Sequence, residues 1–520
     1  MSDQRTLVPL AVPQTQAARH IDVAGLGGTG GSTRRNTGDV PGFLARGGAK
    51  TVVPRRPVGR RAAQRHLFGR AGSPRRRAVR RCDPRVNKEE ELMTRSRSAA
   101  FVTVVLVAAS CGGDDDGGGD TDAKLSARGP ITIWLSNNKE EKAWGEAMVA
   151  AWNTDHADEA ITAQEIPAGD TSEEVIGAAV TAGTAPCLVF NTAPAAVPQF
   201  QKQGGLVALD GFEDGASYVE ARSGDRAEQY RSTDGNLYQM PWKANPVMIF
   251  YNRAMFEAAG LDPDAPPLGT YDEFLATSRA LVADGGAKAA IWPSPTSQFF
   301  QLWFDFYPLF AAASNQQLVV DGKATFASAE GFAVAAMWRT MYDEGLAPRE
   351  EHNGDSFADG LAAMSIVGPW AVAVYGDKID WGVAPVPTAE GKPAEEIQTF
   401  SDEKSIGMFT ACESQATAWD VLKFATSEAQ DGALLEATGQ MPMRTDVVGT
   451  FADYFSAHPD YVAFAEQAER TIEVPNVSNS IAVWQTLRDA WSESVIFGKS
   501  DPEAALTAAA EEINDLVAQG

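Results

Sequence analysis

The chain has 520 residues and a formal net charge of −25, which is distributed very unevenly. Residues 1–92 contain 19 Lys and Arg against 7 Asp and Glu, whereas the rest of the chain contains 25 against 62. The length exceeds that of one ordinary domain, and the change of sign predicts a boundary near residue 92. The acidic body excludes nucleic acid as an expected partner, because binding phosphates requires clustered Lys and Arg.

The first 92 residues are rich in Arg, Gly, Pro and Ala and lack an apolar period, so we expect this basic extension to be disordered. Gly25–Gly30 has the glycine spacing of a dinucleotide site, but no strand–helix pattern surrounds it, and we expect no cofactor there. The run Arg75–Arg81 fits either nucleic-acid binding or a solvated tail, and we favour the tail. Our hypothesis is that translation starts at Met93. Peptides from residues 1–92 in the purified native protein would refute it.

Residues 93–110 have the pattern of a secretory signal peptide. Arg95 and Arg97 give a basic start, and the apolar run Ala99–Ala109 follows. This run is too short to span a bilayer as a stable helix. We therefore expect the protein to be exported.

The signal peptide ends in Ala-Ala-Ser followed by Cys111, which is similar to a lipoprotein signal. We expect lipidation of Cys111; the alternative is a plain secretory signal with an incidental cysteine. Residues 111–129 read as a tether, because Gly is flexible and clustered Asp stays solvated. A calcium site is the other interpretation of the Asp cluster, but the spacing is not that of an EF-hand.

From residue 130 onward the sequence alternates strand and helix patterns, which is typical of an α/β fold with a parallel sheet. Trp144, Met148 and Trp152 recur at helical spacing and mark one buried face. The expected strands are Ile131–Leu135, Ile161–Ile166 and Leu188–Phe190, and the expected helices are Lys139–Asn153, Glu173–Ala182 and Ala196–Gln203.

The stretch Asn236–Leu275 is the most informative part of the chain. It predicts a strand at Val247–Tyr251 and a short helix at Arg253–Ala259 closed by Gly260. A capping box of Thr270 and Glu273 then starts a new helix.

Three further motifs follow in order. The stretch Phe357–Pro387 contains Gly-Pro-Trp370, Ser405–Asp446 contains an Ala-Trp helix and a Met-Pro-Met-Arg turn, and Val474–Glu493 is rich in Val and Trp. The four motifs together resemble the family 1 extracellular solute-binding proteins, the sugar-binding subunits of ABC importers. The resemblance runs from about Ile131 to the C-terminus.

The resemblance implies an α/β, two-lobed periplasmic-binding-protein type II fold. Each lobe is then a doubly wound sheet with flanking helices, and a hinge joins the lobes. Lobe 1 is expected to comprise residues 130–242 and 406–440, and lobe 2 residues 243–402 and 445–520. The ligand should bind beyond the carboxyl ends of the strands, in the cleft between the lobes.

The family fold also suggests how the cysteines pair. In that fold the strand that starts at Cys187 lies next to the strand Ser405–Cys412 and runs antiparallel to it. The resemblance therefore implies a Cys187–Cys412 disulfide in an oxidising compartment. Two separate buried thiols are the alternative.

A sugar site combines aromatic rings, which stack on C–H faces, with polar groups that pair with hydroxyls. The family's contact positions and this chemistry give ten candidate ligand-binding residues. They are Asn138, Lys139, Asn191, Trp242, Asn245, Trp303, Trp370, Asp402, Arg444 and Trp484.

Six of these candidates have a structural alternative. Asn138 could only cap a helix, and Asn191 could only form an Asx-turn. Arg444 could pin its loop to an acidic neighbour. Trp303, Trp370 and Trp484 could belong to the core, and Trp484 in particular lies among apolar residues.

No catalytic motif of a hydrolase or nucleotide-binding enzyme occurs in the sequence, so we expect a binding protein without cofactor or metal. The expected role is to bind a sugar or oligosaccharide and deliver it to the permease subunits of an ABC importer. The protein should act as a monomer, lipid-anchored at the outer face of the cytoplasmic membrane. The alternatives are a carbohydrate sensor or adhesin with the same fold, or a glycoside-processing enzyme, which needs two carboxylates about 5–10 Å apart.

Overall fold

The computed structural model describes residues 123–520 except Asp170 and Ser294. The expectations for residues 1–122, including the extension, the signal peptide and lipidation of Cys111, lie outside the described residues. In the part of the chain that is described, no helix combines the length and apolar content needed to cross a membrane.

A six-stranded sheet combines strands from residues 131–244 with strands from residues 404–442, in the order β13-β4-β12-β3-β1-β2. Strands β1, β2 and β3, the first three along the chain, run parallel, as the alternating pattern predicted. The sheet is nevertheless mixed, because β12 returns antiparallel between β3 and β4. The strands are β1 (Ile131–Leu135), β2 (Ile161–Glu165), β3 (Leu188–Thr192), β4 (Met240–Ala244), β12 (Lys404–Met408) and β13 (Met441–Pro442).

The helices around this sheet bury one apolar face each. In the first of them Trp144, Met148 and Trp152 are all buried, which confirms the predicted face. The helices are α2 (Lys139–Asp155), α3 (Ser172–Ala182), α4 (Val197–Lys202), α5 (Gly215–Ser223), α11 (Gln415–Ala425) and α12 (Glu428–Thr438).

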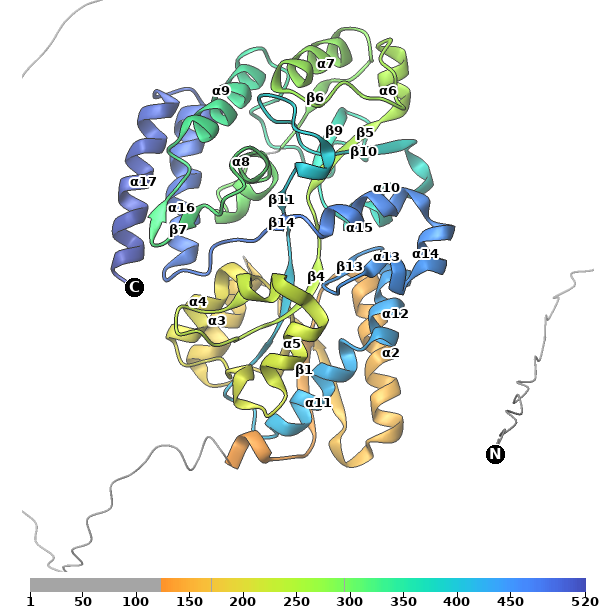
Figure 1. Cartoon of the computed structure of the whole chain (residues 1–520), viewed down its shortest axis with the longest axis vertical. Helices are drawn as coiled ribbons and strands as arrows, with labels where there is room; N and C mark the ends of the chain where they lie inside the picture. Colours follow the sequence, from red (N-terminus) through yellow and green to blue (C-terminus); the bar gives the residue numbers. More distant parts are fainter. Residues whose placement is uncertain (1–122, 170, 294) are drawn as a thin grey trace, which may run out of the picture. The chain divides into compact units, whose positions relative to one another are not determined.

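A second, four-stranded sheet has the order β10-β5-β9-β6 (Figure 1). Strand β5 runs antiparallel to both neighbours, and β6 and β9 are parallel. The predicted capping box is confirmed, since Glu273 N donates to Thr270 Oγ1 (3.1 Å) and Thr270 N donates to Glu273 Oε2 (3.0 Å). The strands are β5 (Met248–Asn252), β6 (Ala289–Ile291), β9 (Ala362–Val367) and β10 (Trp381–Ala384).

The remaining elements pack mainly around the second sheet and between the two sheets. Two short hairpin strands are β7 (Val319–Val320) and β8 (Lys323–Ala324). The helices are α6 (Arg253–Ala258), α7 (Tyr271–Ala283), α8 (Phe306–Ser314), α9 (Ala329–Asp343), α10 (Val372–Tyr375), α13 (Val447–Thr450), α14 (Ala452–Ala457), α15 (Val462–Ala468), α16 (Ser480–Trp491) and α17 (Pro502–Ala518).

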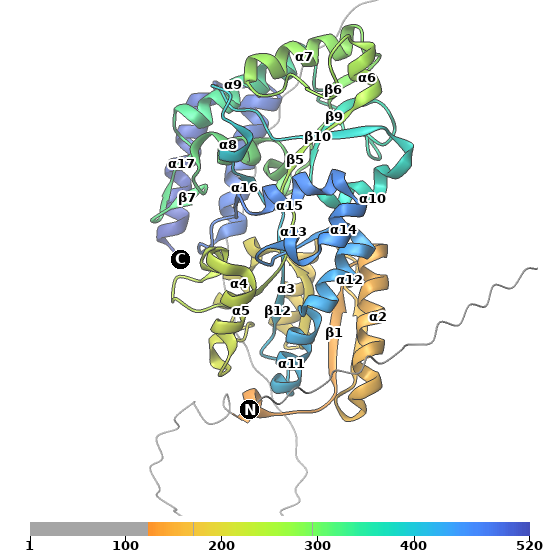
Figure 2. The same ribbon diagram turned by 45° about the vertical axis from the view of Figure 1, so that its right-hand side comes forward.

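The two sheets are joined by extended crossover segments (Figures 1 and 2). One runs from β4 to β5 through Asn245, and another runs from β11 (Thr399–Phe400) to β12 through Asp402. Strand β11 also pairs in parallel with β14 (Thr471–Ile472). The two crossover segments are hydrogen-bonded to each other. Val247 N donates to Phe400 O and Asp402 N donates to Asn245 O, both at 2.9 Å.

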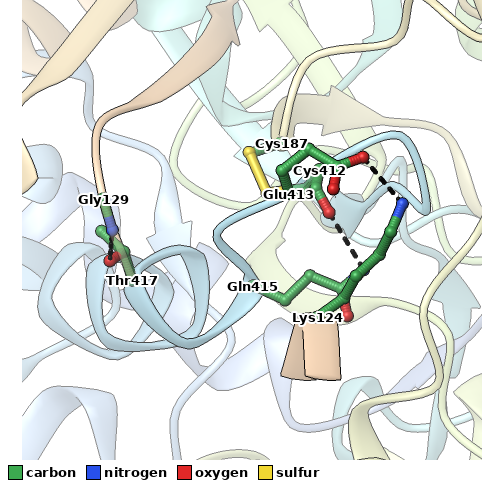
Figure 3. The surroundings of a disulfide bond; sticks show 7 residues. All are labelled: Lys124, Gly129, Cys187, Cys412, Glu413, Gln415 and Thr417. Carbon is green, nitrogen blue, oxygen red and sulfur yellow. Dashed lines mark hydrogen bonds and ion pairs between the residues drawn. A yellow bond between two sulfur atoms is a disulfide. The ribbon is translucent and has the colours of Figure 1, made fainter. Parts of the chain in front are cut away.

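Cys187 and Cys412 form a disulfide with a Cα–Cα distance of 4.5 Å (Figure 3). These are the two cysteines that the family fold was expected to pair. Cys187 immediately precedes β3, and Cys412 follows β12, with which β3 is antiparallel. The bond therefore lies beside the N-terminal end of β3, whereas Asn191 lies near the opposite end of that strand.

The described N-terminal residues are fastened close to this disulfide (Figure 3). Lys124 forms an ion pair with Glu413 (2.8 Å), and Gly129 N donates to Thr417 Oγ1 (3.1 Å). Residues 123–129 were expected to be the end of the tether, but they attach to the body instead. The attachment includes the partly buried Leu125, which packs against the core.

Candidate functional site

A pocket of about 160 Å³ opens where the crossover segments meet the ends of the first sheet. Five of the ten predicted residues line it, namely Asn138, Asn191, Asn245, Trp370 and Asp402. Five further residues that were not predicted complete the lining, namely Ser136, Glu141, Lys243, Lys404 and Gln440.

The fold explains why these residues converge. Strands β1 and β3 are parallel, so Ser136 after β1 and Asn191 near the end of β3 lie at the same edge of the sheet. The two crossover segments bring Asn245 and Asp402 to this edge. Asn191 has a φ of +70°, a left-handed conformation that Asn tolerates better than most residues.

Trp370 is the lining residue that comes from the second sheet. It follows β9, is half-buried, and packs edge-on against Phe304 at 6.0 Å between ring centroids. A Cβ atom on Gly368 would lie only 1.9 Å from the Trp370 ring. The Gly in Gly-Pro-Trp is therefore required for the indole to fold back over the backbone beside the pocket.

A buried ion pair forms the floor of the pocket. Lys243 Nζ lies 2.7 Å from Glu141 Oε1, and the two side chains are 1% and 6% exposed. Burial raises the pKa of Glu141, but the Lys243 charge and hydrogen bonds from Lys243 and Gln440 outweigh it and hold that pKa below its usual value. Burial lowers the pKa of Lys243, and Glu141 offsets only part of this effect.

Two acceptor atoms in the pocket lining have no partner in the described part of the chain. Asn245 uses its Nδ2 to donate to Asp402 O (3.1 Å) and Gln440 Oε1 (3.3 Å), and its Oδ1 is buried and unpaired. Glu141 Oε2 is likewise buried and unpaired. A buried acceptor without a donor costs about 1–3 kcal/mol. Both oxygens are covered by neighbouring atoms, so they do not themselves face the pocket opening.

The start of α2 contributes Asn138 but not Lys139. Asn138 Oδ1 accepts from the backbone N–H of Glu140 (3.0 Å) and Glu141 (2.9 Å), so it caps the helix and also lines the pocket. Lys139 has a side chain that is 93% exposed, and it lies outside the pocket lining. The prediction of a ligand contact for Lys139 finds no support in this geometry.

Trp242 was expected to contact the ligand, but the structure places it in the core. It is 1% exposed and packs between Trp144 and Phe190, each with ring centroids at 5.3 Å. Lys243 Nζ lies 4.4 Å from the centre of the Trp242 ring, so the two side chains are in contact. Lys243 lines the pocket, and Trp242 does not.

Trp303 and Trp484 are also core residues rather than ligand contacts. They are 5% and 0% exposed, and their rings pack against each other at 5.9 Å. Trp484 belongs to the apolar face of α16 together with Leu487 and Trp491. For these two tryptophans the core alternative is the one observed.

Arg444 is held by an acidic neighbour, which was the alternative to a ligand contact. Its Nε lies 3.0 Å from Asp431 Oδ2, and its guanidinium also donates to Thr426 O (3.2 Å). The same carboxylate binds Arg222 Nη2 at 2.8 Å. Arg444 therefore fixes the turn around β13 instead of lining the pocket.

A second hollow of about 320 Å³ lies at the carboxyl ends of β6 and β9. Phe304 lines this hollow and also contacts Trp370, so the hollow adjoins the indole. Its wall combines rings with hydroxyl groups, contributed by Trp292, Phe304, Ser356, Ser365 and Tyr375.

Two carboxyl groups are buried next to the crossover segments. Glu403 is 1% exposed and accepts hydrogen bonds from Trp242 N (3.1 Å) and Ser405 Oγ (2.9 Å). Glu473 is 2% exposed and accepts from Tyr230 Oη (3.2 Å). Burial raises the pKa of Glu403 to about 8, and burial together with the charge of Glu403 raises the pKa of Glu473 well above its usual value.

The raised pKa of Glu403 predicts a stability that falls with rising pH. The folded protein keeps this proton up to about pH 8, whereas the unfolded chain releases it near 4.5. The stabilisation is complete below about pH 4.5 and is lost as the pH approaches 8, by at most about 1.4 kcal/mol per pH unit. Glu403→Gln should remove this loss, so urea unfolding at pH 8 should show it to be about 1–3 kcal/mol more stable than wild type. Parallel pH profiles of the two proteins would contradict the assignment.

The described residues, 123–520 without Asp170 and Ser294, contain no cluster of three or more His, Cys, Asp or Glu placed to hold a metal ion. The site offers hydrogen-bonding groups, two lysine–carboxylate ion pairs and an indole. This arrangement can bind a polar, hydroxyl-bearing molecule.

Comparison with known proteins places the chain in a family. Residues 147–462 match the family model described as bacterial extracellular solute-binding protein. The chain is 24% identical over 309 residues to the maltodextrin-binding protein of Bacillus subtilis (strain 168), covering 56% of this chain and 69% of that protein. It is also 24% identical over 411 residues to the galactooligosaccharide-binding protein of the same organism, covering 75% and 90%.

Solved structures show the same fold. The cyclic alpha-maltosyl-1,6-maltose binding protein from Arthrobacter globiformis superposes with a TM-score of 0.64 at 23% identity, covering 76% of this chain and 100% of that one. This likeness confirms the expected periplasmic-binding-protein fold class. The family match extends over more than half of the sequence. The chain belongs to the bacterial extracellular solute-binding proteins, and it is a binding protein rather than an enzyme.

Proposed function

We propose that this protein binds a sugar or oligosaccharide between two lobes and delivers it to the permease subunits of an ABC importer. The lobes correspond to residues 130–242 with 406–440 and residues 243–402 with 445–520, so the crossover segments form the hinge. Closure about such a hinge would bury the ligand between the strand ends.

The observation that carries this proposal is the composition of the pocket. The Trp370 indole, which follows a strand of the second sheet, lines the pocket together with the polar side chains of Asn138, Asn191 and Asn245. Sugars present the complementary surfaces, C–H faces for the ring and hydroxyls for the polar side chains. The relatives named for binding maltodextrin and galactooligosaccharide support the same ligand class.

The second hollow supports an oligosaccharide rather than a single sugar. It adjoins Trp370 through Phe304 and offers further rings and hydroxyls. A chain of sugar units that stacks on Trp370 could place its next unit there.

We also propose that the protein is exported and held by a lipid on Cys111 at the outer face of the cytoplasmic membrane, where it works as a monomer. The extracellular family supports export. Mass spectrometry of the native N-terminus should detect a diacylglyceryl-modified Cys111, and an unmodified N-terminus elsewhere would contradict the anchor.

Trp370→Ala tests the stacking contact. Loss of the indole should weaken binding of maltotriose by about 1–3 kcal/mol, as expected for a buried aromatic anchor. The measurement is isothermal titration calorimetry. Trp381→Ala is the matched control, because Trp381 is half-buried on β10 but lines neither hollow. Equal affinities of Trp370→Ala and wild type would remove Trp370 from the site.

A further inference from the structure

A continuous hydrogen-bonded network crosses the floor of the pocket, and Lys243 lies at its centre. Lys243 Nζ donates to Glu141 Oε1 (2.7 Å) and to Asn191 Oδ1 (3.0 Å). Gln440 Nε2 donates to the same Glu141 oxygen (2.7 Å), and Asn245 Nδ2 donates to Gln440 Oε1 (3.3 Å). The network thus joins β3, β4, the first turn of α2 and the β4–β5 crossover.

The chemistry of these partners fixes the direction in which the amide of each asparagine faces. An ammonium group donates and never accepts, so Lys243 forces Asn191 to turn its Oδ1 toward the floor. The Asn191 Nδ2 is then left for the pocket that this residue lines. A backbone carbonyl only accepts, so Asp402 O holds the Nδ2 of Asn245, whose Oδ1 is left unpaired.

We propose that Lys243 is a positioning residue that sets the hydrogen-bond polarity of the pocket at Asn191, so that this residue presents a donor to the ligand. This inference rests on the proposed function, which it makes more specific. A sugar hydroxyl can accept from this donor.

The same network disfavours a phosphorylated ligand. The two lysines of the pocket are each paired with a carboxylate, Lys243 with Glu141 and Lys404 with Asp402. Neither is left free to neutralise a phosphate. The ligand class is therefore an uncharged, hydroxyl-rich molecule.

Exchanging the two residues of the Lys243–Glu141 pair separates the orientation of the Asn191 amide from the effect of the pair on protein stability. The double variant Lys243→Glu/Glu141→Lys keeps the pair and the net charge, but residue 243 then accepts and Asn191 must turn its Nδ2 toward it. Asn191→Asp should raise the melting temperature in the wild-type background, where it meets an ammonium. It should lower the melting temperature in the exchanged background, where it meets a carboxylate. A shift of the same sign in both backgrounds would overturn the proposal.

A neutral background keeps this test decisive if the exchanged variant does not fold. Lys243→Met/Glu141→Gln removes both charges together, so no buried charge is left unpaired. In this background Asn191→Asp should no longer raise the melting temperature. If Asn191→Asp still raises the melting temperature without Lys243, the Lys243–Asn191 contact does not determine the orientation of the Asn191 amide.

Ligand titration gives the second readout. The exchanged variant and Asn191→Asp should each bind maltotriose at least about tenfold more weakly than wild type, because the donor at Asn191 is lost. Asn137→Asp makes the same charge change on an exposed residue outside the lining and should change the dissociation constant less than about twofold. Glucose 1-phosphate should not bind the wild type.

The outcomes separate the two proposals. If wild type binds maltotriose and both variants bind equally well, Lys243 does not set the polarity. If wild type binds no sugar, the proposed function fails, and the melting temperatures still decide the role of Lys243.

Discussion

Arg222→Met should lower the free energy of unfolding by about 3–5 kcal/mol, because it removes one partner of a fully buried ion pair. Arg222 and Asp431 are 2% and 0% exposed and lie 2.8 Å apart. The guanidinium also donates to the backbone carbonyls of Pro241 (2.7 Å), Trp242 (3.0 Å) and Met443 (2.8 Å). It thereby holds β4 next to β13 beside the crossover.

Chemical denaturation measures this effect directly. Arg279→Met is the matched control, because Arg279 pairs with Glu344 at the surface, where the two side chains are 48% and 40% exposed. An exposed pair contributes at most about 1 kcal/mol. If the two variants lose similar amounts of stability, the buried pair is not the structural support described here.

Removing the disulfide should have the second large effect. The bond joins residues 225 positions apart, so it restricts the unfolded chain strongly. Cys187→Ala/Cys412→Ala should therefore lower the free energy of unfolding by about 2–5 kcal/mol. Urea unfolding with and without a reducing agent checks this, since reduction should destabilise wild type but leave the double variant unchanged. A double variant as stable as the oxidised wild type would contradict the expectation.

Sugar affinity should survive this change. The disulfide is beside the start of β3, and Asn191 is near its other end. Loss of binding in a folded double variant would show that the two ends of the strand are coupled.

Much of the fold could be read from local signals. The strands β1, β2 and β3 and the helix α2 follow apolar periodicity, and Thr270 with Glu273 marks a helix start. The mixed order of the six-stranded sheet could not be read in this way. It depends on β12 inserting between β3 and β4, which are far from it in the sequence.

The site was harder to predict because tryptophan serves both core and ligand surfaces. Trp370 follows a Gly-Pro turn, a signal that distinguishes it from the helical Trp484. Lys243 was missed because the sugar argument favoured its aromatic neighbour Trp242, whose ring centre lies 4.4 Å from the Lys243 ammonium. The Lys243–Glu141 pair joins residues 102 positions apart, so no local pattern could reveal it.

The most direct test of the central claim is a crystal structure of the protein soaked with maltotriose or with the oligosaccharide that most increases its melting temperature. We predict an intact sugar in the pocket, with one ring against Trp370 and hydroxyls within hydrogen-bond distance of Asn191 and Asn245. A sugar bound elsewhere on the surface, or found cleaved, would contradict the account.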